Sequence, residues 1–321
     1  MLGCIQSKRF KKQPTGLSMH WQALTPQTYA LGESPFWHPV EQMLYWVDIP
    51  GQHIHRCNVF MGNVESWAMP SEPGCMAPAE SSGLVIALRD GIYRSRSWGG
   101  DLVKLADAVH DTATTRFNDG KADPVGRFWA GTMFEPRTAA NAQLFTLTGA
   151  ALEAKVSHAT IANGLAWSPD AKTIYWADTP THTVRAWDWD ARANLMSRER
   201  VFKQWPGKPA AWQFGQEGYG GYGGRPDGAA VDVEGNYYVA MFEGARICKL
   251  SPAGVELASI AVPAQCPTMP CFGGDDLKTL YVTTARYNRS DTELHAYPQS
   301  GCVFSARVDV PGLPVNFFRN E

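Results

Sequence analysis

The sequence lacks a long hydrophobic run. No apolar stretch in its 321 residues approaches the roughly 20 residues that a helix needs to span a bilayer, and no hydrophobic segment of the signal-peptide kind lies near Met1. These absences argue against a membrane partner. The default expectation is a cytoplasmic protein.

The sequence also lacks an excess of positive charge. It has 29 Lys and Arg residues against 31 Asp and Glu residues, for a formal net charge of -2, and no basic stripe. Because affinity for nucleic acids depends on clustered Lys and Arg, nucleic acid is not an expected partner. The charge pattern favours a small-molecule ligand.

Cysteine is present but lacks metal-binding or disulfide spacing. The seven cysteines form an odd, scattered set without a C-x-x-C pair, which favours reduced, buried thiols over a disulfide framework. No G-x-S-x-G elbow occurs, and Ser34 has no histidine predicted beside it, so a serine nucleophile is not expected. The glycine-rich sequence GYGGYGG at 218–224 lacks GK[ST], which argues against a nucleotide site.

Six short aromatic or β-branched segments are the main positive feature. Each follows a turn signal, as buried strands of antiparallel sheets do. They recur roughly every 40 to 50 residues, with one longer interval, and a period of this length is typical of four-stranded propeller blades. The segments are Met43–Asp48, Gly83–Leu88, Gly126–Gly131, Thr173–Asp178, Gly235–Ala240 and Thr279–Thr284.

The repeat predicts an all-β protein, a six-bladed β-propeller of four-stranded antiparallel sheets. We expect one domain over residues 19–321, preceded by a disordered tail over residues 1–18, and a monomer or weak oligomer. The longer interval holds an irregular segment, Trp205–Gly224, which lies just before Asp227 in the sequence. This segment is predicted to be a loop extension and is a candidate lid, with Tyr219–Tyr222 as possible substrate contacts.

Four polar residues recur at one phase of the repeat. Loops at one phase of a propeller gather at one end of its central channel, so side chains on separate blades could converge there. Carboxylate and amide oxygens suit hard divalent cations such as calcium, magnesium or manganese. The alternative for Asn163-Gly164 and Asp227-Gly228 is a simple turn, since Asn and Asp before Gly are common turn residues. The four residues are Glu33, Asn118, Asn163 and Asp227.

Several motifs together resemble the gluconolactonase, regucalcin and luciferin-regenerating family, from about residue 24 to the C-terminus. The resemblance rests on Gly32–Pro35, Arg116–Lys121 with Asp123–Phe128 and Ala130–Met133, Asn163–Ser168, Pro226–Gly228 and Cys271–Gly274. It implies a six-bladed propeller with one catalytic divalent cation in the channel. The ion could be calcium, zinc, manganese, magnesium or iron(II).

The resemblance also implies roles for individual residues. Glu33, Asn163 and Asp227 match the family's metal ligands, whereas Arg116 and Asn118 match positions that contact or adjoin the substrate. The implied reaction is hydrolysis of a sugar lactone, such as gluconolactone, xylonolactone or galactonolactone, to the sugar acid. The metal would polarise the lactone carbonyl, and Asp227 would act as general base.

One position departs from the family pattern. Proline stands at Pro136, where some animal members carry an acidic residue that contacts sugar hydroxyls, so substrate preference does not transfer from those members. The neighbouring Glu135 is a candidate substrate contact instead.

Two other functions stay open at the level of the sequence: a non-catalytic calcium-binding or regulatory propeller, and a protein-interaction scaffold. A second metal site at His53-Ile54-His55 is less expected than a solvated outer strand, although alternation puts both imidazoles on one face.

Overall fold

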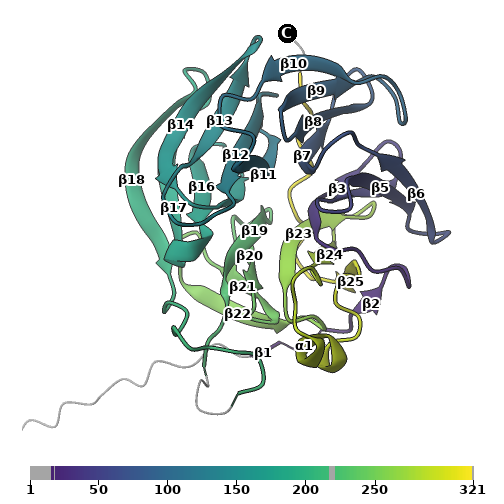
Figure 1. Ribbon diagram of the computed structural model, residues 1–321, viewed down its shortest axis with the longest axis vertical. Coiled ribbons are helices and arrows are strands. Elements are labelled where there is room, and N and C mark those ends of the chain that lie inside the picture. Colours follow the sequence, from purple (N-terminus) through teal and green to yellow (C-terminus); the bar gives the residue numbers. More distant parts are fainter. Residues whose placement is uncertain (1–15, 18, 217–220, 320–321) are drawn as a thin grey trace, which may run out of the picture.

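The computed structural model describes residues 16–17, 19–216 and 221–319. Figure 1 shows six sheets arranged around a common centre, with the first strand of each sheet innermost. Each sheet contains a blade of four antiparallel strands, so the predicted six-bladed β-propeller is confirmed. Strand order follows the chain, except that the N-terminal region adds a short outer strand to two of the sheets. The described residues contain one short α-helix, α1 (Asp291–Ala296), and one 3-10 turn, η1 (Thr179–Thr181).

The first three blades follow one another without interruption. Blade 1 contains β3 (Gly32–His38), β4 (Met43–Asp48), β5 (His53–Asn58) and β6 (Asn63–Ala68). Blade 2 contains β7 (Pro73–Pro78), β8 (Leu84–Leu88), β9 (Gly91–Ser95) and β10 (Val103–Asp107). Blade 3 contains β11 (Thr115–Ala122), β12 (Phe128–Phe134), β13 (Ala142–Thr148) and β14 (Ala151–Ala159).

The remaining blades complete the ring. Blade 4 contains β15 (Ala162–Trp167), β16 (Thr173–Asp178), β17 (Thr183–Asp190) and β18 (Leu195–Gln204). Blade 5 contains β19 (Arg225–Val231), β20 (Tyr237–Phe242), β21 (Arg246–Leu250) and β22 (Glu256–Ala261). Blade 6 contains β23 (Pro267–Gly273), β24 (Thr279–Thr284), β25 (Phe304–Arg307) and, from the other end of the chain, β2 (Gln22–Ala23).

The six repeated segments fall on the second strand of each blade. β4, β16 and β24 have the predicted bounds, and β8, β12 and β20 differ by one to three residues at their ends. These strands are buried along nearly their whole length, because each blade packs between two others. Aromatic pairs fill the interfaces, as where Trp129 of blade 3 meets Trp167 of blade 4 with ring centroids 5.8 Å apart.

The N-terminal region closes the ring. β2 pairs with β25, so the outermost strand of the last blade comes from the start of the chain. Gly16–Leu17 forms β1, which pairs in parallel with β22 and gives blade 5 a fifth, two-residue strand that the repeat did not predict. The rest of the predicted tail, residues 1–15 and 18, lies outside the described residues, and its disorder stays a prediction.

Every innermost strand has a register shift in its pairing with the second strand. In blades 1, 3, 4 and 5 the shift begins at Glu33, Phe117, Asn163 and Pro226, respectively. Each of these is one of the four recurring polar residues or the residue directly before one. A β-bulge of this kind re-aims side chains. The Asn-Gly and Asp-Gly pairs therefore lie inside strands at bulges, and the turn alternative for them was wrong.

Two smaller predictions concern cysteine and histidine. The six described cysteines are all buried free thiols, as expected. The solvated strand predicted at His53–His55 was wrong for His55, which is buried and stacks on Trp46, because β5 is the third strand of its blade and not the outermost. None of the described helices has the length and hydropathy to cross a membrane.

Candidate active site

One cavity collects the predicted site residues. It has a volume of about 530 Å³ and opens where the innermost strands of blades 1, 3, 4 and 5 begin. The predicted residues in it are nearly buried, except for Glu135, which follows β12 and is exposed. The bulged strands direct the buried side chains into the channel. The six predicted residues in its lining are Glu33, Arg116, Asn118, Glu135, Asn163 and Asp227.

A chain of hydrogen bonds orients the two amide side chains. Arg116 Nη1 donates to Asn118 Oδ1 at 2.8 Å, and Asn118 Nδ2 donates to Asn163 Oδ1 at 3.0 Å. Asn163 Nδ2 in turn donates to Thr179 Oγ1 at 2.8 Å, whose hydroxyl donates to the carbonyl of Pro226, next to Asp227. Asn163 Oδ1 accepts one of these bonds, from Asn118, and its second lone pair is available to a ligand.

Two buried carboxyl groups in this cavity are hard to ionise. Burial raises the pKa of Glu33 well above its ordinary value, and the nearby Asp227 and Asp119 raise it further. Burial, followed by repulsion from Asp119, raises the pKa of Asp227 to about 8, although Arg225 and the Gly228 amide oppose this. A cation between the two carboxylates would remove this penalty.

The available donors fit a hard divalent cation. Within the described residues, no three His, Cys, Asp or Glu side chains are grouped closely enough to hold a metal ion. A site here would combine the carboxylates of Glu33 and Asp227 with the amide oxygen of Asn163. Such an all-oxygen set suits calcium, magnesium or manganese and resembles no histidine-rich structural zinc site.

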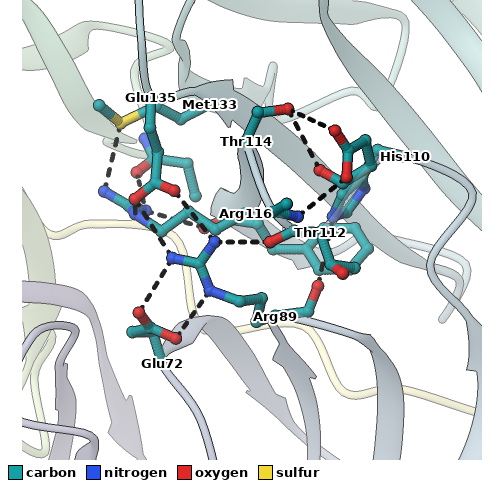
Figure 2. Close-up of polar contacts among 12 residues, drawn as sticks. Glu72, Arg89, His110, Thr112, Thr114, Arg116, Met133 and Glu135 are labelled. Carbon is teal, nitrogen blue, oxygen red and sulfur yellow. Dashed lines mark hydrogen bonds and ion pairs between the residues drawn. The ribbon is translucent and has the colours of Figure 1, made fainter.

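Arg116 is held in place by an ion-pair network (Figure 2). Its Nη2 lies 3.2 Å from Met133 Sδ, and its Nε lies 3.8 Å from Glu135 Oε1. Glu135 is itself bridged by Arg89 at 3.0 and 3.2 Å, and Arg89 also binds Glu72 through two bonds of 2.9 Å. Glu135 thus lines the cavity as predicted while already paired with two arginines.

Several cavity residues were missed by the sequence reasoning. Thr179 lies outside the recognised motifs, as does Arg89, which is not in the lining itself but binds Glu135. Arg225 had a usable signal, because residues i and i+2 of a strand share a face and Arg225 is two positions before Asp227. Lys208 and Arg289 come from segments that carry no repeat signal, whereas Glu243 directly follows the second strand of blade 5, as Glu135 and Thr179 follow those of blades 3 and 4.

The irregular segment before Asp227 contributes to the cavity. Lys208 is among its lining residues. Tyr222 Oη lies 3.0 Å from His182 Nε2, and its ring packs on Trp212 with centroids 5.2 Å apart. Tyr219 lies outside the described residues, and a lid role for this segment stays a prediction.

A second cavity of about 280 Å³ lies where the innermost strands end. Its lining is mostly apolar, with Trp37, Trp167 and Phe272 among its residues, and Lys121 is one of its few polar groups. Burial lowers the pKa of Lys121. The channel therefore has a polar end with the predicted site residues and an apolar opposite end.

Known proteins of similar sequence cover most of this chain. Residues 31–286 match the model of the SMP-30/Gluconolactonase/LRE-like region. A 6-deoxy-6-sulfogluconolactonase from Pseudomonas putida is 42% identical over 293 residues, which cover 91% of this chain and 96% of the relative. Regucalcin from Danio rerio is 32% identical, over 88% of this chain and 93% of the relative.

Solved structures show the same fold. A calcium-binding protein, regucalcin, from Agrobacterium tumefaciens superposes with a TM-score of 0.87 at 26% identity, covering 96% of this chain and all of the other. A luciferin-regenerating enzyme superposes with a TM-score of 0.83 at 27% identity, covering 94% of this chain and 100% of the other.

Proposed function

Because this chain belongs to the SMP-30/gluconolactonase/LRE-like family and is a lactonase, we propose that it hydrolyses a sugar lactone with the help of one divalent cation. The observation that carries the proposal is the convergence of two buried carboxylates and an oriented amide oxygen in one cavity. Gluconolactone-type substrates are the first candidates. The Pseudomonas putida relative is named for a sulfonated gluconolactone, so that lactone belongs among them.

Three residues would hold the cation: Glu33, Asn163 and Asp227. When bound, a divalent cation supplies a Lewis acid that polarises the lactone carbonyl and stabilises the developing oxyanion. Calcium, magnesium and manganese fit the oxygen donors best, while zinc and iron(II) remain candidates. The chain's own contribution is to keep two negative charges buried and close, which favours the metal-loaded form.

Asp227 is the proposed general base. Ester hydrolysis needs a group that accepts a proton from the attacking water within hydrogen-bond reach. The Asp227 carboxyl lines the cavity, and Arg116 and Arg225 act on its charge from two sides. Because no serine elbow occurs in the sequence, water is the proposed nucleophile.

Arg116 and Asn118 are the proposed substrate-binding residues. Both are nearly buried and share a hydrogen bond, so little side-chain entropy is lost when a ligand binds. The forked guanidinium suits ring or carbonyl oxygens of a lactone. Glu135, which the sequence assigns to substrate contact, also lies within 3.8 Å of Arg116 and can help to orient it.

The test is a hydrolysis assay across gluconolactone, xylonolactone, galactonolactone and 6-deoxy-6-sulfogluconolactone, with each divalent cation in turn. At least one lactone should be opened well above its spontaneous rate, and Asp227→Asn should lower kcat by about 100-fold or more. Spontaneous rates for the whole panel would refute the proposal and favour the non-catalytic propeller. Wild-type turnover by Asp227→Asn would remove that residue from the mechanism.

A further inference from the structure

A second group of charged side chains occupies another wall of the same cavity. They come from four separate segments: the stretch after β12, the irregular segment after β18, the start of β19, and the stretch before α1. Chain segments far apart in sequence thus bring their cations to one place. This cationic wall consists of Arg137, Lys208, Arg225 and Arg289.

Three members of the cationic wall surround one buried carboxylate. Lys208 Nζ lies 3.0 and 2.9 Å from the two oxygens of Glu243, Arg289 Nη1 lies 3.2 Å from it, and Arg225 Nη2 lies 3.5 Å from it. Glu243 is only 3% exposed. One carboxylate therefore serves three cations, and its burial keeps it from being reached by solvent ions.

One cation of the wall has no ion-pair partner among the described residues. Arg289 also pairs with Glu293 at 2.6 Å, while Arg137 has no carboxylate within 4.0 Å among residues 16–17, 19–216 and 221–319. The carboxylates in direct ion-pair contact with the four cations are Glu243 and Glu293, and the cavity lining also carries Glu33, Glu72, Glu135 and Asp227. Burial, followed by repulsion from Arg225, lowers the pKa of Arg137, and Glu243 and Glu135 oppose this.

The wall is held in position before any ligand arrives. The guanidinium groups of Arg225 and Arg289 lie 5.2 and 5.6 Å from the ring centroid of Phe242, and Lys208 Nζ lies 4.7 Å from that of Trp212. These side chains are 14% to 30% exposed. Positioned, partly desolvated cations bind an anion more strongly than flexible surface cations do.

The wall lies at a useful distance from the proposed reaction centre. Arg225 and Asp227 are two positions apart on β19, about 7 Å along an extended strand. A sugar lactone with its carbonyl near Asp227 would extend its far end over a comparable distance. The wall can therefore contact a substituent that is remote from the lactone carbonyl.

We propose that the cationic wall is a binding subsite for an anionic substituent on the substrate, a sulfonate, phosphate or carboxylate. The proposal rests on the proposed lactonase function and narrows its substrate class to sugar lactones that carry a negative charge far from the carbonyl. Arginine forks and a lysine ammonium supply the donors that such oxyanions accept. An uncharged lactone offers this wall no oxyanion to bind.

The test compares kcat/KM for 6-deoxy-6-sulfogluconolactone, 6-phosphogluconolactone and glucarolactone with kcat/KM for gluconolactone at low ionic strength. At least one anionic lactone should be preferred by about tenfold or more, which corresponds to one charge-assisted hydrogen bond. Arg225→Gln and Lys208→Gln should each reduce that ratio by about tenfold. The matched control is Arg307→Gln, which removes an exposed arginine paired with Asp276 outside the cavity, and it should keep the wild-type ratio.

The outcomes separate the two proposals. If gluconolactone is turned over with no preference for any anionic lactone, or if both variants keep the wild-type ratio, the subsite proposal is wrong. The proposed lactonase function would still stand. If no lactone is opened, the proposed function fails, and calorimetry with 6-phosphogluconate and gluconate decides the subsite. Tighter binding of the phosphorylated acid, lost in Arg225→Gln, would support it, and equal binding would overturn it.

Discussion

At the scale of single residues, the site depends on hydrogen bonds that fix which atom of an amide faces the cavity. Thr179 helps to fix this for Asn163, because its hydroxyl accepts from Nδ2 and donates to the Pro226 carbonyl, while Asn118 Nδ2 donates to Oδ1. An asparagine whose amide could rotate would offer nitrogen as often as oxygen to a cation. Thr179 is therefore a positioning residue, although it touches neither carboxylate in the described contacts.

Thr179→Val tests this role, since valine keeps the shape and removes the hydroxyl. We expect kcat/KM to fall by about tenfold with a higher metal requirement, and stability to fall by about 1–3 kcal/mol because two buried groups lose their partner. Thr284→Val is the matched control, since buried Thr284 Oγ1 likewise accepts one hydrogen bond and donates another, in its case with the backbone of Gly301 and Cys302. Similar activity in both variants would contradict the positioning role.

His55 predicts a pH effect on stability. It is 6% exposed, and burial lowers its pKa to about 4 from an ordinary value near 6.5. The folded protein thus disfavours the charged imidazole, whereas the unfolded protein binds a proton at His55 near pH 6.5. The contribution of neutral His55 to the free energy of unfolding is therefore complete above about pH 6.5 and is lost as the pH falls toward about 4. The loss should total about 3 kcal/mol.

Urea denaturation of wild type and His55→Phe, with chelator present, measures this contribution. The stability difference between the two proteins should shift in favour of the variant between pH 6.5 and 4. The buried carboxyls of the cavity are common to both proteins and cancel in the difference. A pH-independent difference would show that His55 stays neutral in both states or titrates normally.

At the scale of elements, the bulges in the innermost strands direct the site residues into the channel. Gly164, which follows Asn163, has φ +65°, and a Cβ added there would lie 2.4 Å from Tyr237 Oη, the hydroxyl that donates to the Gly164 carbonyl. In blade 1 the equivalent place is taken by Ser34, which also has a positive φ of 48°. A left-handed residue after the site residue thus recurs in both blades.

Gly164→Ala should destabilise the protein by about 1–3 kcal/mol from strain, with an added steric cost, and should lower metal affinity because Asn163 moves. Gly149→Ala separates the two causes, since Gly149 has φ +56° with no atom within 4 Å of its added Cβ. Thermal unfolding and metal titration of both variants provide the readout. Equal stability losses in the two variants would mean that the contact with Tyr237 is unimportant.

At the scale of the whole molecule, the repeat made the ring predictable. The second strands are continuous apolar runs, so their pattern is visible in the sequence, and Glu33, Asn118, Asn163 and Asp227 could be placed in one channel from their common phase. The ring closure by β2 and the extra strand β1 were not predictable in this way, because two-residue strands leave no periodic signal.

The rest of the cavity could not be predicted for a physical reason. Lys208, Glu243 and Arg289 meet only because the ring brings blades 4, 5 and 6 together, and the two cations come from segments without repeat spacing. The bulges could not be predicted for a similar reason. An Asn-Gly pair is typical of a turn when only its neighbours in sequence are considered, and it becomes a bulge only when the residues on both sides of it pair as a strand. Local sequence thus predicted the ring better than it predicted the contacts across it.

The proposed metal ligands come from blades 1, 4 and 5, so a bound cation would join three parts of the ring. The most direct test is lactone hydrolysis by chelator-stripped protein during titration with each divalent cation. We predict that activity is lost on stripping, returns with one equivalent of a suitable ion, and needs a higher ion concentration in Glu33→Gln. Full activity of the stripped protein, or an unchanged requirement in Glu33→Gln, would contradict the proposed metal site.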